Sequence, residues 1–156
     1  MKGITLALIL GLFLNFSVGA SMVSFYVIET GVPESAGNVR HTELWENAFL
    51  DIFFDAGHIV SNAPILRLEK KPSGDILRMV DMQDARGSGV DFVLIAQLDY
   101  NTDFKSPGEI SFFIYRVTPR EKILERTILP RSIRTVRDEY DEIKSVVRGL
   151  VPYIGE

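Results

Sequence analysis

The chain has two histidines, His41 and His58, whose imidazole nitrogens could bind a metal ion. His41 and Glu43 stand in the His-x-Glu order of zinc deaminases, but those enzymes also need a cysteine pair and the sequence has no Cys. A zinc site takes three or four ligands at set spacing, which two separate histidines do not provide. We therefore expect His41 to precede a helix and His58 to follow its end, where the negative end of the dipole favours a histidine.

One acidic segment resembles a calcium loop. Asp99-x-Asn101-x-Asp103 matches the first half of such a loop, in which alternate side chains supply oxygen ligands. The second half departs from the pattern, because Phe104 stands where the turn needs Gly and Ile110 where a bidentate Glu belongs. The segment reads as a polar loop between strands, and weak calcium binding by it remains an alternative.

Catalytic motifs do not emerge from the remaining polar residues. Gly87-Ser88-Gly89 is too short for a nucleophile elbow and precedes a strand, where the elbow needs a strand leading into it. Glu43, Asp51 and Asp55 share one face of a predicted helix, whereas a glycosidase needs two carboxyl groups across a cleft. We therefore expect no catalytic residue, no cofactor and no enzyme activity. A small exported hydrolase or glycan-active enzyme without a recognisable motif, or a carrier of an apolar ligand, are the alternatives.

An aromatic strand gives the strongest functional signal. Phe113 and Tyr115 point to one face of the strand, and the residues that alternate with them, Phe112 and Ile114, make the other face apolar too. Either helices cover both faces, or a partner covers one of them. We predict the second case, with a binding surface made by the hairpin and the loop beside it. The predicted partner-binding residues are Phe113, Tyr115, Asp99, Tyr100 and Asp103.

Periodicity along the chain predicts a mixed α/β fold. The expected order is a strand over 22–28, a helix over 42–56, a strand over 59–69 interrupted near Pro64, a helix over 75–86, a strand over 90–98, a polar loop over 99–108, strands over 109–117 and 122–129, and a last helix from 136. This order predicts one mixed sheet of four to five strands with three helices packed on it.

The helix over 42–56 has the clearest pattern. Thr42 is placed to cap it, and Gly57 to end it. Trp45, Phe49 and Phe53 form one i,i+4 row that should be buried, while a polar row lies opposite. Thr135 and Asp138 are spaced for a capping box at the start of the last helix.

The amino-terminal segment has the layout of a secretory signal peptide. Lys2 precedes an apolar run over 4–14, and Val18 and Ala20 supply small side chains at the −3 and −1 positions of a cut after Ala20. We predict a signal peptide over 1–20 and a single domain over 21–156. The run is shorter than the roughly 20 residues that span a bilayer, so we expect a periplasmic or secreted protein without stable membrane insertion after cleavage.

The charge of the chain and its lack of cysteine exclude some classes of partner and modification. Residues 1–20 contain one base and no acid, so the predicted mature chain carries 16 basic and 21 acidic residues and a net charge of −5. An acidic surface repels phosphate backbones, and we expect no nucleic-acid partner. Without Cys the chain has neither a disulfide nor a lipid-modified amino-terminal cysteine.

Residues 84–94 (Asp-Ala-Arg-Gly-Ser-Gly-Val-Asp-Phe-Val-Leu) resemble the junction between a helix and a Gly-Ala-Asp-Tyr-Val-Leu strand in bacterial envelope domains of the TolB amino-terminal, CsgG and LpoB type. Residues 53–60 and the hairpin over 110–128 are similar to the same pattern. The chain departs from it in having Val90 for the Ala, no propeller after the domain and no lipid-modified Cys. The resemblance implies a non-catalytic adaptor or assembly module that binds an envelope protein.

Overall fold

The computed structural model describes residues 19–32, 40–100, 107–130 and 135–155, with side chains from Thr42 onward in the first helix. The elements in chain order are β1 (Met22–Thr30), α2 (Arg40–Asp55), β2 (Ile59–Asn62), β3 (Leu66–Leu68), the 3-10 turn η2 (Ile76–Met79), α3 (Met82–Gly87), β4 (Phe92–Tyr100), β5 (Pro107–Arg116), β6 (Glu121–Ile128), α4 (Val136–Arg148) and the 3-10 turn η3 (Val151–Tyr153). The α/β fold class predicted from the sequence is confirmed.

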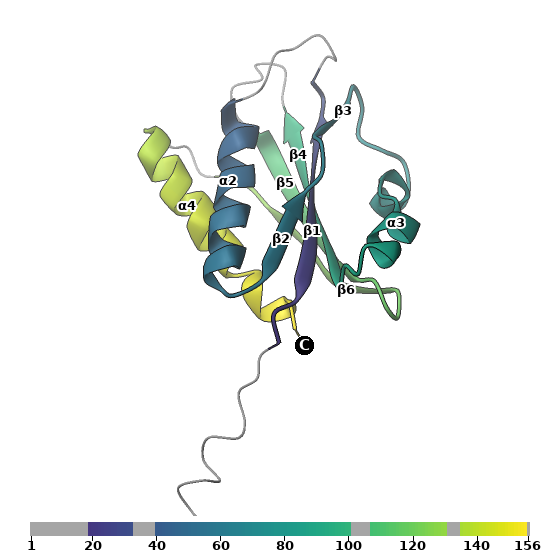
Figure 1. Cartoon of the computed structure of the whole chain (residues 1–156). Helices are drawn as coiled ribbons and strands as arrows, with labels where there is room; N and C mark the ends of the chain where they lie inside the picture. Colours follow the sequence, from purple (N-terminus) through teal and green to yellow (C-terminus); the bar gives the residue numbers. More distant parts are fainter. Residues whose placement is uncertain (1–18, 33–39, 101–106, 131–134, 156) are drawn as a thin grey trace, which may run out of the picture.

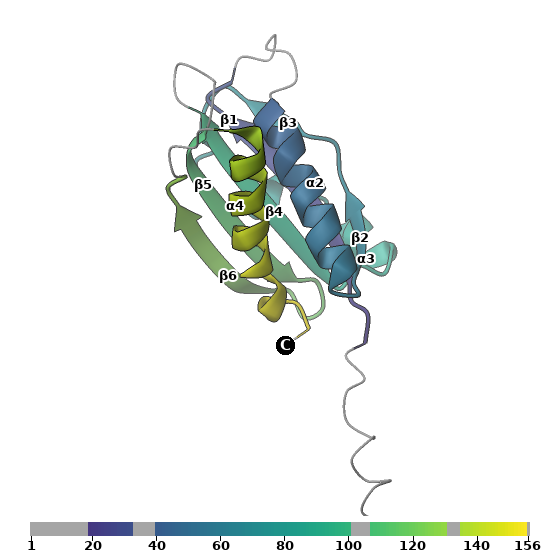
Figure 2. The same cartoon turned by 90° about the vertical axis from the view of Figure 1, so that its left-hand side faces the viewer.

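The sheet is mixed, and β1 lies inside it. The strand order is β2-β1-β4-β5-β6, and β3 also pairs with β1 beyond the end of β2. β1 runs parallel to β2, β3 and β4, whereas β4, β5 and β6 form an antiparallel meander. Figure 2 shows the two edges of the sheet, with β2 and β3 at one side and β6 at the other.

Helices cover the sheet on both faces, as Figures 1 and 2 show. α2 and α4 pack side by side on one face over a core that includes Phe25, Leu94 and Phe112. η2 and α3 cover part of the opposite face over a smaller core that includes Ile28 and Ile95. Strand side chains alternate between these two cores, because successive residues of a strand point to opposite faces.

The apolar row of α2 is buried as its spacing predicts. Trp45, Phe49 and Phe53 are 4%, 0% and 1% exposed. The Phe49 ring stacks on Phe25 of β1 with their centroids 4.1 Å apart. Rings of this size bury enough apolar area to dominate a core, so this row anchors α2 to the sheet.

The end of α2 is also as predicted. Gly57 has a φ of 87°, and its N–H donates to the carbonyl of Phe54 over 2.9 Å. The N–H of His58 donates to the carbonyl of Phe53 over 3.0 Å, and the two rings lie 5.9 Å apart. This pair of bonds is the Schellman motif, which needs a left-handed residue where Gly57 stands.

Three local predictions need correction. The strand expected over 59–69 is interrupted near Pro64 as predicted, but its two parts are separate strands, β2 and β3, because Pro64 cannot donate to a ladder. With β3 counted, the sheet has six strands. The helix expected over 75–86 is η2 followed by α3. The Asp75 carboxylate accepts from Leu77 N and the Asp81 carboxylate from Gln83 N and Asp84 N, so each starts its own turn.

Thr42 does not cap α2. The helix starts two residues earlier, at Arg40, and Thr42 is fully buried within its first turn. At α4 the prediction is confirmed, because the Thr135 hydroxyl accepts from Asp138 N over 3.1 Å and donates to the Asp138 carboxylate over 2.6 Å. Within the part of the chain that the structure describes, no helix has the length and apolar character needed to cross a membrane.

Candidate functional site

The aromatic residues of the predicted hairpin surface lie against η2 and α3. Tyr115 is 5% exposed, and its hydroxyl donates to the Asp75 carboxylate over 3.3 Å. Burial raises the pKa of Tyr115 to about 12, and the Asp75 carboxylate adds to the shift. Phe113 packs half-buried beside the same core. The sequence predicted that Phe113 and Tyr115 present an uncovered surface to a partner. For Tyr115 this is wrong, because the segment before α3 covers its face of β5.

The predicted residues at the end of β4 are engaged inside the protein. The Asp99 carboxylate accepts from the Thr30 hydroxyl over 2.9 Å and lies 3.8 Å from the Lys71 ammonium. Tyr100 is 5% exposed. Asp103, with the rest of the calcium-like segment beyond Tyr100, lies outside the described residues. The structure therefore brings Asp99 and Tyr100 together at one strand end but leaves neither ring nor carboxylate without a protein contact.

A buried polar network joins the carboxyl ends of the parallel strands to α2 and β3. Glu29 of β1 has no exposed surface, and its two carboxylate oxygens accept from the Thr42 hydroxyl and from Arg67 Nε, the latter over 2.6 Å. The Thr42 hydroxyl also lies 3.1 Å from the Tyr100 hydroxyl. Burial is the main cause that raises the pKa of Tyr100, and the Glu29 charge raises it further. The Tyr100 phenol therefore stays protonated, and it links the end of β4 to α2 through the Thr42 hydroxyl.

This network occupies the place where open α/β sheets bind ligands. β1 continues through α2 to one side of the sheet and β4 continues to β5 on the other, so their carboxyl ends form a topological switch point. Here the polar groups satisfy one another, and Gly31 closes the backbone over them. A Cβ on Gly31 would lie 2.5 Å from the Tyr100 carbonyl oxygen, and its φ of 77° favours glycine. The arrangement fastens α2 and β3 to the sheet.

The histidines do not form a metal centre with described neighbours. His58 is 5% exposed, and burial lowers its pKa, so the neutral ring is favoured. The side chain of His41 lies outside the described residues. Among the residues that the structure describes, no group of three His, Cys, Asp or Glu side chains could hold a metal ion.

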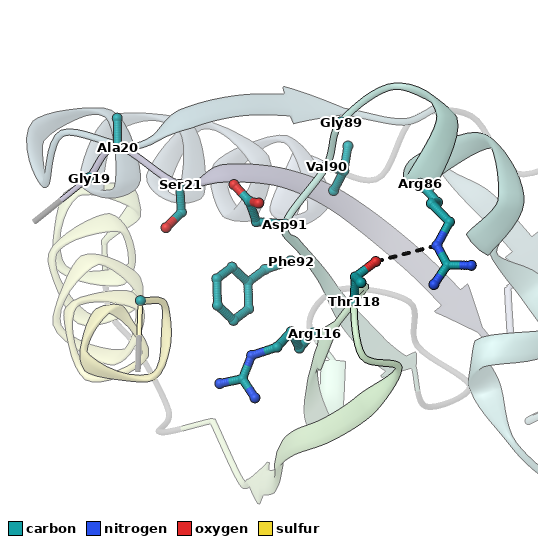
Figure 3. A pocket seen from close by; sticks show the side chains of 11 residues that line it. Gly19, Ala20, Ser21, Arg86, Gly89, Val90, Asp91, Phe92, Arg116 and Thr118 are labelled. Carbon is teal, nitrogen blue, oxygen red and sulfur yellow. Dashed lines mark hydrogen bonds between the residues drawn. The ribbon is translucent and has the colours of Figure 1, made fainter.

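A polar hollow of about 510 Å³ opens at the amino ends of β1 and β4. Figure 3 shows Arg86 directed at Thr118, and the bond from Arg86 Nε to the Thr118 hydroxyl is 3.3 Å long. Arg116 lies over the Phe92 ring, 5.9 Å from its centroid, and pairs with Glu121 at 2.7 Å. The charged groups at this hollow thus have partners within the protein.

A second, apolar hollow of about 230 Å³ lies between α2 and the edge strand β2. We call it the edge groove; Leu50, Asp51, Phe54, Asp55 and Val60 line it. The Phe54 ring is 75% exposed. Ile59, the neighbour of Val60 on β2, is 58% exposed. Large apolar side chains held in water beside an open strand edge are typical of a binding surface.

Two carboxylates of α2, Asp51 and Asp55, line the edge groove. Asp51 accepts from the Tyr140 hydroxyl over 2.7 Å and pairs with Lys144 at 3.0 Å, which links α2 to α4. These contacts lower the pKa of Asp51. Burial raises the pKa of Glu46, one helical turn before Leu50, against the effect of its hydrogen bond to Asn62. The groove therefore combines an apolar floor with the Asp55 carboxylate, while the Asp51 charge is paired with Lys144.

Our reading of the sequence missed this groove. The apolar rows that it identified contain Phe53 but not Phe54. The missed signal is the i,i+4 row of Glu46, Leu50 and Phe54, in which apolar residues continue around the helix beyond the buried stripe. Phe54 lies outside the buried stripe, and its side chain faces solvent.

Comparison with protein families gives one match. The model of a family described as "Uncharacterised protein" matches residues 25–112, more than half of the chain. The chain belongs to this family. The matched stretch runs from β1 to β5 and so contains α2, β2 and the edge groove. A search of the curated proteins found no match.

Solved structures with a similar arrangement include three bacterial proteins. TolB from Acinetobacter baumannii has a TM-score of 0.49 and 12% identity, with 88% of this chain and 30% of that chain covered. A PelC dodecamer from Paraburkholderia phytofirmans has a TM-score of 0.48 and 13% identity, with 88% and 90% covered. A protein of the DUF330 family model from Xanthomonas campestris has a TM-score of 0.37 and 11% identity, with 85% and 81% covered.

The chain spans under a third of the TolB structure. TolB is also one of the three types that the sequence pattern resembles, and that resemblance stays a prediction. At these identities and TM-scores, the likeness concerns the arrangement of strands and helices.

Proposed function

We propose that this protein is an exported, non-catalytic adaptor of the bacterial cell envelope that binds another protein through the edge groove and β2. The observation that carries the proposal is the exposure of Phe54 and Ile59, at 75% and 58%, beside an edge strand. The secretory layout of residues 1–20 supports the location.

The edge groove combines the features of a protein-binding surface: an exposed aromatic ring, half-buried apolar residues and a polar rim. Phe54 is aromatic, and truncating aromatic anchors commonly costs an interface about 2 kcal/mol or more. Leu50 and Val60 lie half-buried beneath it, so a partner side chain placed there would lose contact with water on several sides. Asp51 and Asp55 supply a polar rim of the kind that surrounds such anchors.

The proposal moves the working surface away from the hairpin that the sequence suggested. Tyr115 is covered by the segment before α3, whereas Phe54 is not covered by any described part of the chain. Tyr100, like Tyr115, is 5% exposed and is bonded inside the protein, so its partner-binding role is corrected too. The partner-binding roles of Phe113, Asp99 and Asp103 remain predictions, and the edge groove is the surface that we place first.

Photocrosslinking in intact cells tests the proposal. A photoreactive phenylalanine analogue is placed at position 54 and, as a matched control, at position 129, because Leu129 is also 75% exposed but follows β6. We expect a discrete crosslinked species from position 54 that is missing from position 129. Equal crosslinking from both positions, or none from position 54, would overturn the proposal.

A further inference from the structure

We propose that the β2 edge accepts an extended segment of another protein as an added strand, with apolar side chains over Phe54 and Ile59 and a basic side chain beside Asp55. This inference rests on the proposed function, since it names the chemistry of the partner at the same surface. It follows from the backbone of β2, from the contrast between the two edges of the sheet and from the charge of α2.

The outer side of β2 has backbone groups that pair with no strand within the described part of the chain. Ile59 N donates to the Ser21 carbonyl over 3.0 Å, and Ala63 N donates to the Phe25 carbonyl over 2.9 Å. In a parallel strand the N–H and C=O of one residue point to the same side, and the side alternates along the chain. Val60 and Asn62 therefore direct their backbone groups away from β1, toward any added strand.

The two edges of the sheet are protected differently. β6 presents charged side chains along its length, namely Glu121, Lys122, Glu125 and Arg126. Charges on an edge strand discourage pairing with another chain. β2 has the sequence Ile-Val-Ser-Asn, with no charge and no proline. Pro64 follows and ends the open stretch, so an added strand can pair over about four residues.

Apolar side chains lie on both faces of β2. Val60 is in register with Val23 and packs with the core beneath α2. Ile59 is in register with Met22, so it points to the face that carries α3. The side chains of an added strand alternate in the same way. One set would cover Phe54 in the edge groove and the other set would cover Ile59.

The charge of α2 selects a basic segment. Asp55 stands in the last turn of α2, which has no basic residue, and no ion pair of Asp55 forms within the described residues. A carboxylate at the negative end of a helix dipole is unfavourable, and a cation beside it relieves the repulsion. A second copy of this chain paired through the same edge would bring the same carboxylates to the interface. The partner is therefore a different protein, with Lys or Arg flanking its apolar residues.

Peptide binding to the full chain tests the inference. The probe is a fluorescent, amidated seven-residue peptide in which a central run of valines is flanked by lysines, and its binding is followed by fluorescence anisotropy. Two further peptides carry glutamate for lysine, or N-methyl groups on the amides along one edge. We expect the glutamate and N-methylated peptides to bind at least tenfold more weakly, because one loses the charge match and the other the backbone bonds.

Variants locate the site. Phe54→Ser, Ile59→Lys and Asp55→Lys should each weaken binding of the lysine peptide about tenfold. Leu129→Ser matches the exposure of Phe54, and Asp141→Lys matches the charge change of Asp55 at an exposed position on α4, so both should leave binding unchanged. Asp55→Lys should keep the melting midpoint or raise it, because a cation suits the end of α2.

Each outcome separates the inference from the proposed function. Equal binding of the lysine and glutamate peptides overturns the charge preference, and equal binding of the N-methylated peptide overturns strand addition. Either result together with crosslinking from position 54 leaves the adaptor role standing. Peptide binding at β2 without crosslinking in cells overturns the adaptor role instead. Failure of all three peptides to bind overturns the inference.

Discussion

The ion pair between Glu29 and Arg67 gives the sharpest test of the fold. Replacing Arg67 by Met keeps much of the side-chain volume but leaves the Glu29 carboxylate, which has no exposed surface, without its cation. Breaking a buried pair from one side costs about 3–5 kcal/mol, because the remaining charge stays desolvated. The Arg67 side chain is 20% exposed. Water can therefore reach one end of the pair, and we expect a loss near the lower value, about 3 kcal/mol.

Unfolding in urea, followed by fluorescence, measures this loss. Trp45 is the single tryptophan and is 4% exposed, so its emission reports on the core beneath α2. A loss of about 3 kcal/mol lowers the ratio of folded to unfolded protein more than a hundredfold and the melting midpoint by roughly 10 °C for a domain of this size. Arg78→Met, at an exposed position in η2, serves as the control and should change stability by less than about 0.5 kcal/mol.

A double-mutant cycle identifies the cause. Glu29→Gln removes the charge and keeps the shape, so the variant with both Glu29→Gln and Arg67→Met should be more stable than Arg67→Met alone. A loss below about 1 kcal/mol for Arg67→Met would refute the reasoning, since that is the value of an exposed pair. A double variant less stable than Arg67→Met would refute it as well.

Four further predictions concern a buried ring, two glycines, a buried histidine and the signal peptide. Trp45→Ala should cost about 3–5 kcal/mol in a denaturant melt followed by circular dichroism, because it empties a buried aromatic site. Gly31→Ala should destabilise more than Gly57→Ala in the same melt, since both residues have positive φ but only at Gly31 would the Cβ meet a backbone oxygen, 2.5 Å away. Burial lowers the pKa of His58, so the unfolded chain takes up that proton at a higher pH, from about 6.5 downward, than the folded chain does. Stability should therefore decrease from pH 7.5 to 5.5, and His58→Leu should flatten that slope in urea titrations. Mass spectrometry of the exported protein should find Ser21 as its first residue, and a full-length chain would contradict the cut.

Local patterns were sufficient where a residue and its partner share one element. The burial of Trp45, Phe49 and Phe53 and the end of α2 at Gly57 both follow from spacing within about one turn of helix. The capping box of Thr135 is of the same kind. In each case the competing conformations differ by local propensity and by one apolar face, which the sequence displays directly.

Local patterns failed where the partner is distant. Thr42 has the residue type of a helix cap, but it lies inside α2, where its hydroxyl donates to the carboxylate of Glu29, 13 residues earlier in the chain. Alternation told us that Tyr115 and Phe113 share a face of β5. The alternation could not show that the segment around Asp75, 40 residues earlier, covers Tyr115 and accepts a hydrogen bond from its hydroxyl. The edge groove lies between two elements, so neither helix nor strand periodicity alone indicates it.

The inner position of β1 has a consequence for the order in which the chain can fold. β1 is the first strand, but its parallel partners β2 and β4 begin with Ile59 and Phe92, and Met22 bonds to Asp91 across 69 residues. A chain that crosses a membrane amino terminus first delivers β1 long before either neighbour. Long-range parallel pairing is slow because loop closure precedes any gain from contacts. Until β4 is available, only the short strands β2 and β3 can pair with β1, so the other edge of β1 stays open until then.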